Sequence, residues 1–407
     1  MYLNNDDLAD ALPAAPPPVR IGAASWLLRR ALRYLDKGRL TIVLPSGERV
    51  EHRGTEVGPH GTIVLHNRRA LRRIMTGGDV GFSDGYIAGD WSSPDLVGLI
   101  ALCAENVTRL QETMDGFAPV RLFNRLRHML RGNSKRGSRR NIAFHYDLGN
   151  DFYRLWLDRS MTYSSACALH PGETLEQAQL AKLERIAALL DLQGGERVLE
   201  IGCGWGALAA HLAPQCDGVT GVTLSREQLA FAEERCADLP EGAVDLRLQD
   251  YRDVAETFDR IVSIEMLEAV GETWWPTYFD KLRACLAPGG TALLQVITIR
   301  EDRFESYRSG SDFIQHYIFP GGMLPTATII AKQATDAGLD LVTVETFRQG
   351  YADTLAGWRR RFAAAAAEVD ALGFDAQFRR LWDYYLCYCE AGFRTGTIDV
   401  GLYVLKG

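Results

Sequence analysis

The spacing of apolar residues divides the chain into two parts that meet near residue 141. In the first part, "RLTIVLPSGERVEHRG" (39–54) places two β-rich runs around a Pro-Ser-Gly turn, which predicts a hairpin. "GTIVLHN" (61–67) predicts a further strand, and the spacing over about 23–36 predicts an amphipathic helix. We therefore expect a small α+β domain over 21–120. Residues 1–20 contain "PAAPPPVR" and are expected to be disordered.

The second part, 141–407, alternates strands with helices. "GERVLEIGCGWGALAAHLA" reads as strand, glycine loop and helix, and "DGVTGVTLSREQLAFAEERCA" as strand then helix, with a capping box from Ser225 to Gln228. Three more strands follow in "AVDLRLQDY", "FDRIVSIEML" and "LAPGGTALLQVITI". This alternation predicts a parallel sheet wrapped by helices. The last runs, "LDLVTVETF" and "TIDVGLYVLKG", predict an antiparallel hairpin on the same sheet.

Composition narrows the class of protein. The 407 residues are 47% hydrophobic and carry a net charge of −7, which does not favour nucleic-acid binding. No apolar run reaches the ~18–20 residues of a membrane span, and the acidic start of the chain leads us to expect no signal peptide. The eight cysteines form no CxxC pair, so we expect reduced thiols, no metal site and a cytoplasmic protein.

Charge is concentrated in one segment between the two parts. Residues 121–140 hold eight cations and no acid, and "RLFNRLRHMLRG" places apolar residues at helical spacing among the arginines. This linker has two readings: a solvated connection, or a basic amphipathic helix that lies on an anionic membrane surface.

The clearest chemical signal is the loop "LEIGCGWG" (199–206). Gly202, Gly204 and Gly206 follow an apolar strand and let the backbone approach a ligand closely, and Glu200 suits a cationic group such as an α-ammonium. The spacing is GxGxG rather than the GxGxxG of dinucleotide folds. The pattern resembles the S-adenosylmethionine (SAM) loop of class I methyltransferases; a nucleotide fold or a packing turn is the alternative.

The ends of the next two strands supply further candidates for the same ligand. "GVTLSREQ" lacks the acid that usually grips a ribose, so Thr223 and Gln228 are its polar candidates. "LQDYRD" offers Asp250 for the adenine amino group and Tyr251 for its face, unless the stretch is an ordinary surface turn.

Several stretches together identify a family. "FHYDLGNDFYRLWLDRSMTYSSA", "VLEIGCGWG", "IEMLEAVG", "DFIQHYIFPGGMLP", "YADTLAGW" and "YYLCYCEAGFRTGTIDVGLYVL" resemble the cyclopropane-fatty-acid synthases, over about 140–407. The N-terminal region also looks like that of the phospholipid-acting members. The resemblance implies a class I SAM methyltransferase fold, Rossmann-like with a seven-stranded, mainly parallel sheet, beside the smaller N-terminal domain.

The resemblance also implies a reaction and its residues. SAM methylates a cis double bond of an unsaturated acyl chain of a membrane phospholipid, and bound bicarbonate takes a proton from the resulting cation as a cyclopropane ring closes. By resemblance, Tyr163 and Ser164 touch SAM and the Ser165–Ala166 turn presents donors to bicarbonate. Glu268 would position the bicarbonate, Tyr351 would donate to it, and Ile297 would contribute its backbone.

Two positions depart from the family pattern. Where the family reads Y-S-C-A, this chain reads Y-S-S-A, so Ser165 replaces a cysteine. Where the family reads L-H-T-I, "LLQVITI" puts Gln295 in place of a histidine, and an amide cannot carry a proton charge. These changes argue more against formation of a ring than against SAM-dependent methylation of an acyl chain. A related reaction methylates the alkene and gives a methylene or methyl branch in place of the ring.

Two other functions of the same fold stay open, namely a small-molecule methyltransferase and a non-catalytic lipid-binding protein. The N-terminal domain and the basic linker argue against the first, and the intact glycine loop argues against the second. We expect the protein to lie at the inner face of the membrane, with the N-terminal domain against the bilayer or a partner subunit. A homodimer through this domain is one such arrangement.

Overall fold

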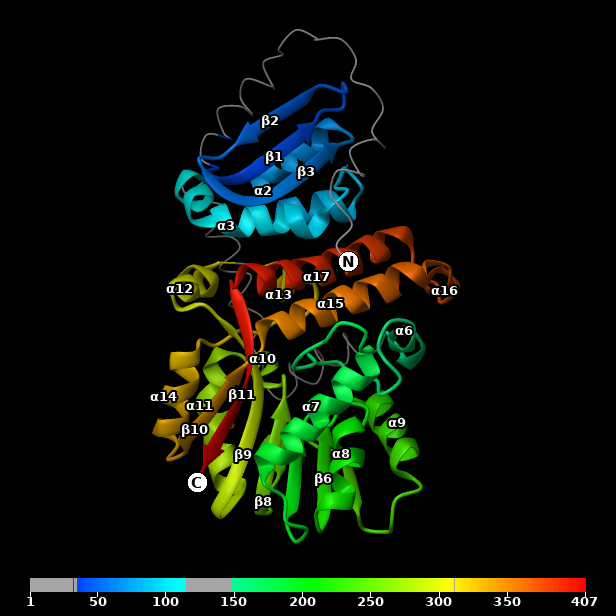
Figure 1. Cartoon of the computed structure of the whole chain (residues 1–407), viewed down its shortest axis with the longest axis vertical. Coiled ribbons are helices and arrows are strands. Elements are labelled where there is room, and N and C mark those ends of the chain that lie inside the picture. The colour runs from blue at the N-terminus through cyan, green and yellow to red at the C-terminus, as the bar shows by residue number, and fades with distance from the viewer. Residues whose placement is uncertain (1–31, 33–34, 115–147, 311) are drawn as a thin grey trace.

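The protein is seen in a computed structural model that describes residues 32, 35–114, 148–310 and 312–407 (Figure 1). The predicted disordered start, most of the predicted helix over 23–36, and the basic linker 121–140 lie outside these residues. Within the described residues, none of the helices combines the length and apolar character that a membrane crossing requires.

Residues 35–114 form the N-terminal unit, a four-stranded sheet with two helices. The strands are β1 (Lys37–Val43), β2 (Arg49–Arg53), β3 (Glu56–Leu65) and β4 (Trp91–Ser92), in the order β2-β1-β3-β4. The predicted hairpin is confirmed as β1 and β2, which pair antiparallel around a turn where Gly47 has φ 83°. Helix α2 (Arg68–Ile87) is capped by Asn67 and kinks at Gly78, and α3 (Leu96–Met114) follows β4.

The rest of the described chain forms the large unit around a seven-stranded sheet. Its order is β10-β11-β9-β8-β5-β6-β7. The predicted parallel part is confirmed, and comprises β5 (Arg197–Ile201), β6 (Gly218–Thr223), β7 (Val244–Leu248), β8 (Phe258–Ile264) and β9 (Leu286–Ile299).

The last two strands, β10 (Asp340–Thr346) and β11 (Ile398–Lys406), pair antiparallel as predicted. The prediction that they form a hairpin is wrong. Three helices lie between them in the chain, α15 (Arg348–Ala364), α16 (Ala366–Ala371) and α17 (Ala376–Thr395), and β11 returns to pair with β9 as well.

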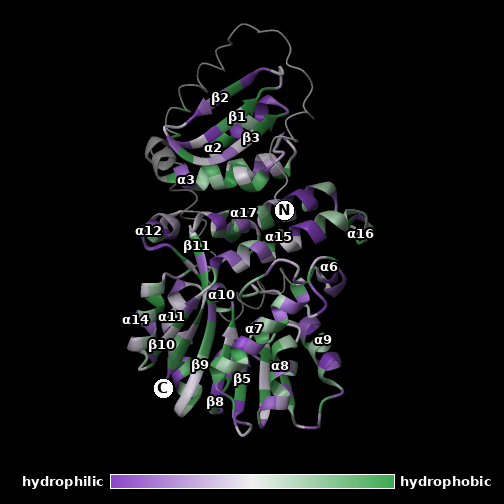
Figure 2. Ribbon diagram, in the orientation of Figure 1, coloured by the Kyte–Doolittle hydropathy of each residue, from purple (hydrophilic) through white to green (hydrophobic). Residues whose placement is uncertain are grey.

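Alternating residues of the central strands face two separate cores. Val198 and Leu293 lie in the core under α7 (Leu175–Leu190) and α8 (Ala207–Leu212). Their neighbours Leu199 and Leu294 lie in the opposite core, under α11 (Trp275–Cys285) and α14 (Ala327–Asp336). Because successive side chains of a strand point to opposite faces, a strand apolar at every position is buried on both sides. Figure 2 shows these strands between helices that carry both hydrophobic and hydrophilic residues.

Helix α17 joins the two units. It packs against α3 and α2, and the ring of Tyr384 contacts Phe82 and Tyr86. The Tyr86 hydroxyl donates to Oδ2 of Asp383 over 2.6 Å, and Nε of Arg380 donates to the Ile87 carbonyl over 2.8 Å. The helix therefore forms a wall shared by the N-terminal unit and the large unit.

Candidate active site

The carboxyl ends of the parallel strands open onto a cavity of about 960 Å³. Most of the predicted site residues line it: Tyr163, Gly202, Gly204, Thr223, Gln228, Asp250, Tyr251, Glu268, Ile297 and Tyr351. The others lie behind its wall: Ser164, Ser165, Glu200, Gly206 and Gln295. The residues predicted from the sequence therefore lie together at one edge of the sheet, and their roles stay a prediction.

The glycine loop connects β5 to α8. All three glycines have positive φ, 85° at Gly202, 52° at Gly204 and 78° at Gly206. A Cβ at Gly206 would lie 2.8 Å from the Ala232 Cβ, so this glycine is required for packing against α9 (Arg226–Cys236). Gly202 and Gly204 instead present bare backbone to the cavity, as a loop that cradles a ligand must.

The polar candidates at the ends of β6 and β7 have partners of their own. The Thr223 hydroxyl donates to Oε1 of Gln228 over 3.0 Å. Ser225 accepts from the Gln228 backbone, but the Gln228 side chain goes to Thr223, so only half of the predicted capping box forms. Asp250 is paired with Arg252 at 2.6 Å, which fixes its carboxylate at the cavity wall. Contact of these residues with SAM stays a prediction.

A buried lysine stands behind the cofactor loop. Nζ of Lys182, on α7, donates to Oγ of Ser164 over 2.6 Å, and the side chain is 1% exposed. Burial lowers the pKa of this amine to about 8, although buried acids that include Glu265 and Glu200 act to raise it. Burial likewise raises the pKa of the Glu200 carboxyl to about 8. Glu200 lies near this cation and not among the cavity-lining residues, so its contact with an ammonium group stays a prediction.

The centre of the site is the carboxylate of Glu265, which directly follows β8. Oε1 accepts from the Ser165 backbone N–H over 2.9 Å and from Nε2 of Gln295 over 2.6 Å. Oε2 accepts from the Tyr351 hydroxyl over 2.6 Å. The residue has φ 51°, and its own N–H donates to the Gln295 carbonyl over 2.8 Å. This left-handed turn at the strand end aims the side chain at the three donors.

Glu268 lies one turn further, on α10 (Leu267–Val270). Its Oε1 accepts from the Ile297 backbone N–H, and among the described residues its Oε2 is buried without a hydrogen-bond partner. Burial, together with the nearby charge of Glu265, raises the pKa of this carboxyl to about 8. Burial also raises the pKa of Glu265. The hydrogen bond from Tyr351 is the largest of the effects that oppose this rise. The three donors from which Glu265 accepts favour its charged form, whereas Glu268 accepts from one donor, so of the two carboxyls Glu265 holds the negative charge more readily.

A bound bicarbonate does not fit these residues. The donors predicted to hold it, at Ser165, Gln295 and Tyr351, are all taken by the Glu265 carboxylate. The Ser165 hydroxyl is turned away and donates to the Ala166 carbonyl over 2.6 Å, while the Ala166 N–H donates to Thr354. The predicted anion site is thus present, but a side chain of the chain itself supplies the anion.

The sequence interpretation missed Glu265 and Lys182. "IEMLEAVG" holds two acids three residues apart, and the resemblance identified only the second. This pair of acids was the signal from which Glu265 could have been predicted, because either carboxylate could supply the negative charge at the end of the strand. Lys182 lies in an ordinary amphipathic helix pattern, and nothing local distinguishes it from a surface lysine.

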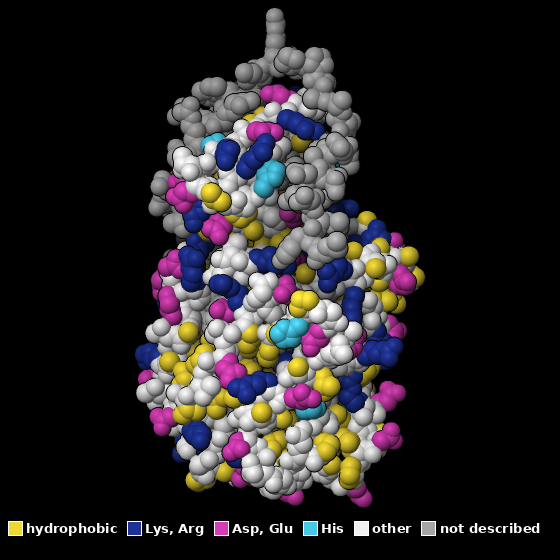
Figure 3. Space-filling view, in the orientation of Figure 1, with side chains coloured by type: hydrophobic (Ala, Val, Ile, Leu, Met, Phe, Trp, Pro, Cys, Tyr) yellow, Lys and Arg dark blue, Asp and Glu magenta, His cyan; other side chains and the backbone are white. Residues whose placement is uncertain are grey.

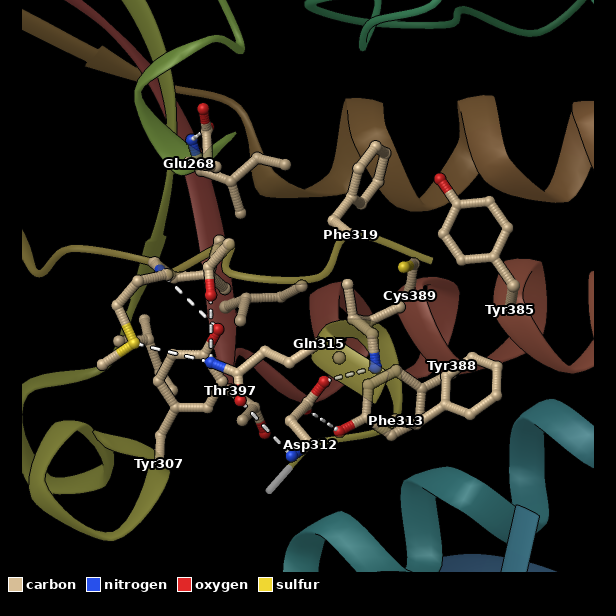
Figure 4. Close-up of a pocket in the computed structure, with 18 of the residues that line it drawn as sticks. Glu268, Tyr307, Asp312, Phe313, Gln315, Phe319, Tyr385, Tyr388, Cys389 and Thr397 are labelled. Carbon is tan, nitrogen blue, oxygen red and sulfur yellow. Dashed lines mark hydrogen bonds between the residues drawn. The ribbon is translucent and has the colours of Figure 1, made fainter. Parts of the chain in front are cut away.

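Aromatic rings complete the wall around Glu265. Tyr163 and Tyr385 line the cavity and share a hydrogen bond of 2.8 Å between their hydroxyls. Figure 4 shows Tyr385 and Phe319 facing the same space as Glu268. Trp274 also lines the cavity, whereas Trp358 and Trp382 are buried in the packing behind it.

Comparison with known protein families gives one clear match. The profile of the family described as "Mycolic acid cyclopropane synthetase" matches residues 133–402. The "Tuberculostearic acid methyltransferase UfaA1" of Mycobacterium tuberculosis is 40% identical over 390 residues, which cover 93% of this chain and 89% of the relative. The "Cyclopropane-fatty-acyl-phospholipid synthase" of Escherichia coli is 36% identical over 346 residues, 83% of this chain and 86% of that protein.

A solved structure shows the same fold for the large unit. The mycolic acid cyclopropane synthase CmaA1, solved in complex with SAH and CTAB, superposes with a TM-score of 0.62 at 31% identity. It covers 66% of this chain and 98% of that one. The class I SAM methyltransferase fold predicted from the sequence is therefore confirmed.

Proposed function

Because the chain belongs to the mycolic acid cyclopropane synthetase family of SAM-dependent methyltransferases, we propose that it methylates the cis double bond of unsaturated acyl chains of membrane phospholipids, with Glu265 as its built-in base. The observation that carries this proposal is the set of three donors that hold the Glu265 carboxylate. A base kept in one place by the fold needs no small anion from solution.

The residues around the site suit a reaction through a carbocation. Bound SAM supplies an electrophilic methyl group on a sulfonium. The methyl carbon would bond to one alkene carbon as its bond to sulfur breaks and sulfur keeps the electron pair, so positive charge develops on the other alkene carbon. The faces of Tyr163, Phe319 and Tyr385 can stabilise this charge, and the apolar wall excludes the water that would trap it.

The proton that leaves the substrate passes to the Glu265 carboxylate. Tyr351 and Gln295 orient that carboxylate, and Glu268 fixes the backbone of Ile297 beside it. Lys182 compensates the buried negative charge from behind. A positioned general base of this kind contributes about 10²–10⁴-fold to a rate.

We propose a methylene branch as the product. A carboxylate is a weak base, and the three hydrogen bonds to Glu265 oppose the rise in basicity that burial causes. The cation then persists long enough for a hydride from the methylated carbon to move to the cationic carbon. Loss of a proton from the new methyl group then forms a double bond between that carbon and the chain, which leaves a methylene branch, and the proton goes to Glu265. The name of the relative UfaA1, a tuberculostearic acid methyltransferase, supports methyl addition without a ring.

A cyclopropane ring is the second candidate product. It is favoured by the relative from Escherichia coli, which is named a cyclopropane-fatty-acyl-phospholipid synthase and aligns with 83% of this chain. The ring closes if the same proton leaves the new methyl group before the hydride moves. Both products therefore need the same base and differ in the order of events at the cation.

Because the proposed substrate is a phospholipid of the membrane, we propose that the protein binds to an anionic membrane surface. Figure 3 shows Lys and Arg side chains on the visible face of the N-terminal unit. Arg49 and Arg53 of β2 are exposed. Residues 121–140 of the sequence add eight cations. Sedimentation with vesicles that contain anionic lipid should fall steeply as salt rises, because salt screens such contacts. Salt-independent binding would contradict this proposal.

Purified protein, SAM and vesicles of a phospholipid with one cis double bond test the function. Gas chromatography with mass spectrometry, before and after catalytic hydrogenation, separates the products. A methylene branch gains mass on hydrogenation and a ring does not. A product that gains mass supports the branch, and one that does not supports the second candidate. Absence of any lipid product, with SAM bound, would contradict the proposed function.

A further inference from the structure

The active-site cavity does not end within the large unit. The same cavity that is lined by Glu265, Glu268 and Tyr351 is also lined by the sheet and helices of the N-terminal unit. The structure of CmaA1 matches 66% of this chain, over a region that the family profile places at 133–402, so the N-terminal part of the cavity is extra to that fold.

The N-terminal part, here called the distal chamber, is lined by one face of each element that surrounds it. On β1 and β3, alternate residues point into it, and on α2 and α3 the residues fall at helical spacing. These residues are almost all aliphatic: Leu40, Ile42, Ile63, Leu65, Leu71, Ile74, Leu99, Ile100, Ala104 and Val107. The side chains that would form an ordinary core thus surround a space.

When no ligand fills it, such a space lowers the stability of the folded protein. Interiors are normally packed as densely as organic crystals, and an apolar void destabilises a fold in proportion to its volume. A polar head group placed there would lose its hydration without gaining partners. An aliphatic chain would gain from burial and would fill the void. The lining therefore selects the hydrocarbon part of a lipid.

A passage connects the distal chamber to the reaction centre. Its wall is a stripe of α17 that includes Tyr385, Tyr388 and Cys389, opposite Phe313 of α13 (Phe313–Tyr317). Figure 4 shows these side chains between Glu268 and the blue-green ribbon of the N-terminal unit. The Tyr388 hydroxyl donates to Oδ2 of Asp312 over 2.6 Å, so this polar group of the passage wall has its hydrogen bond within the protein.

One carboxylate lies at the entrance to the distal chamber. Asp79 follows the kink of α2 at Gly78 and lines the cavity, and burial raises the pKa of its carboxyl against the charge of Arg303 on α12 (Glu301–Ser309). Because burial favours the neutral form of this carboxyl, the aliphatic lining decides the orientation, with the hydrocarbon end of a lipid innermost.

We propose that the N-terminal unit is an acyl-chain-binding module, whose distal chamber holds an aliphatic chain of the lipid being methylated. The proposal rests on the proposed function for the identity of the lipid. The chain is either the methylated one, beyond its double bond, or the second chain of the same phospholipid. In both cases the N-terminal unit contributes directly to substrate binding.

Photo-crosslinking on the wild-type protein tests this without any mutation. Two phospholipids carry a diazirine at the methyl end, one on the unsaturated chain and one on the saturated chain. We expect one of the two to label residues 56–65 or 96–107, which identifies the source of the chain. Labelling of neither segment by either lipid overturns the proposal. Lipid methylation is measured in parallel, so failure of the proposed function is seen separately.

A substitution pair tests the same point through turnover. Ile63→Trp fills the distal chamber, and Val57→Trp on the same strand is its control, because Val57 is fully exposed. With substrates shortened at the methyl end of the chain that crosslinks to the chamber, we expect kcat/KM of Val57→Trp to fall about fourfold per methylene removed from the chamber. For Ile63→Trp, kcat/KM should be low for long chains and independent of length. Equal length dependence in two folded variants overturns the proposal, and if Ile63→Trp does not fold, the crosslinking decides.

Discussion

The hydroxyl of Tyr351 and the carboxylate of Glu265 lie 2.6 Å apart, although 86 residues separate them in the chain. Glu265 is delivered by the end of β8 and Tyr351 by α15. The Tyr351 ring stacks on Phe393 of α17, with centroids 4.4 Å apart. The fold therefore fixes both partners, and the position of the carboxylate is a property of the tertiary structure.

Replacement of Glu265 by glutamine should remove the base and leave the cofactor loop intact. We expect turnover on unsaturated phospholipid to fall about 10²–10⁴-fold, as for loss of a general base. SAM affinity, measured by calorimetry, should stay unchanged. Glu241→Gln is the control, since Glu241 is exposed and outside the cavity. Full turnover of Glu265→Gln would show that the proton goes elsewhere.

Tyr351→Phe should move the pH dependence of the reaction. The base must be ionised, and the hydrogen bond from Tyr351 lowers the pKa of Glu265. Its loss therefore raises that pKa, and the acidic limb of kcat/KM should move up by about 1–2 pH units. Tyr403→Phe, which removes a buried hydroxyl from β11 outside the cavity, should leave the limb in place. A limb that moves equally in both variants would contradict the assignment.

The sequence predicted the parts of the fold that local patterns determine. The glycine loop, the parallel strands and the β1–β2 hairpin each depend on residues that are close in the chain. The hairpin predicted for the last two strands failed because β11 pairs with β9 and β10 across three intervening helices. Two strands near the chain end look like neighbours in sequence whether or not helices separate them.

The site could be predicted in outline but not in its central feature. The donors at Ser165, Gln295 and Tyr351 were identified by resemblance and do converge. Which anion they hold depends on the left-handed backbone of Glu265, and a non-glycine residue gives no local signal of that conformation. The distal chamber could not be predicted either, because a sequence shows which residues are apolar but not whether they fill the space between them.

The serine at position 165 should matter little to the reaction. Its backbone N–H donates to Glu265, while its hydroxyl donates to the Ala166 carbonyl. Ser165→Cys and Ser165→Ala keep the backbone donor, so both should stay within about threefold of wild-type kcat/KM. Steady-state kinetics on vesicles measure this. A loss of the size expected for Glu265→Gln would show that the hydroxyl acts in the reaction.

Lys182 should leave a signature in the pH dependence of stability. The folded protein releases this proton near pH 8, whereas the unfolded chain retains it until about pH 10.5. The unfolded state then binds more protons between these values, so the free energy of unfolding rises with pH across this window. The gain from this one group is about 3 kcal/mol.

Lys182→Met should lack that rise, as measured by urea unfolding at pH 8 and at pH 10.5. Because the cation also lowers the pKa of Glu265, the variant should shift the acidic limb of kcat/KM upward. Lys332→Met, at an exposed lysine of α14, is the matched control and should keep the wild-type slope. If the free energy of unfolding changes equally with pH in Lys182→Met and in the wild type, the lysine lies in a hydrated environment.

The bicarbonate dependence of the wild-type enzyme tests most directly whether Glu265 is the base. Turnover on unsaturated phospholipid vesicles is measured in buffer freed of carbon dioxide and again with added bicarbonate. If the carboxylate of Glu265 occupies the anion site, the two rates will be equal. A rate that collapses without bicarbonate and returns when it is added would show that a small anion displaces Glu265 and acts as the base.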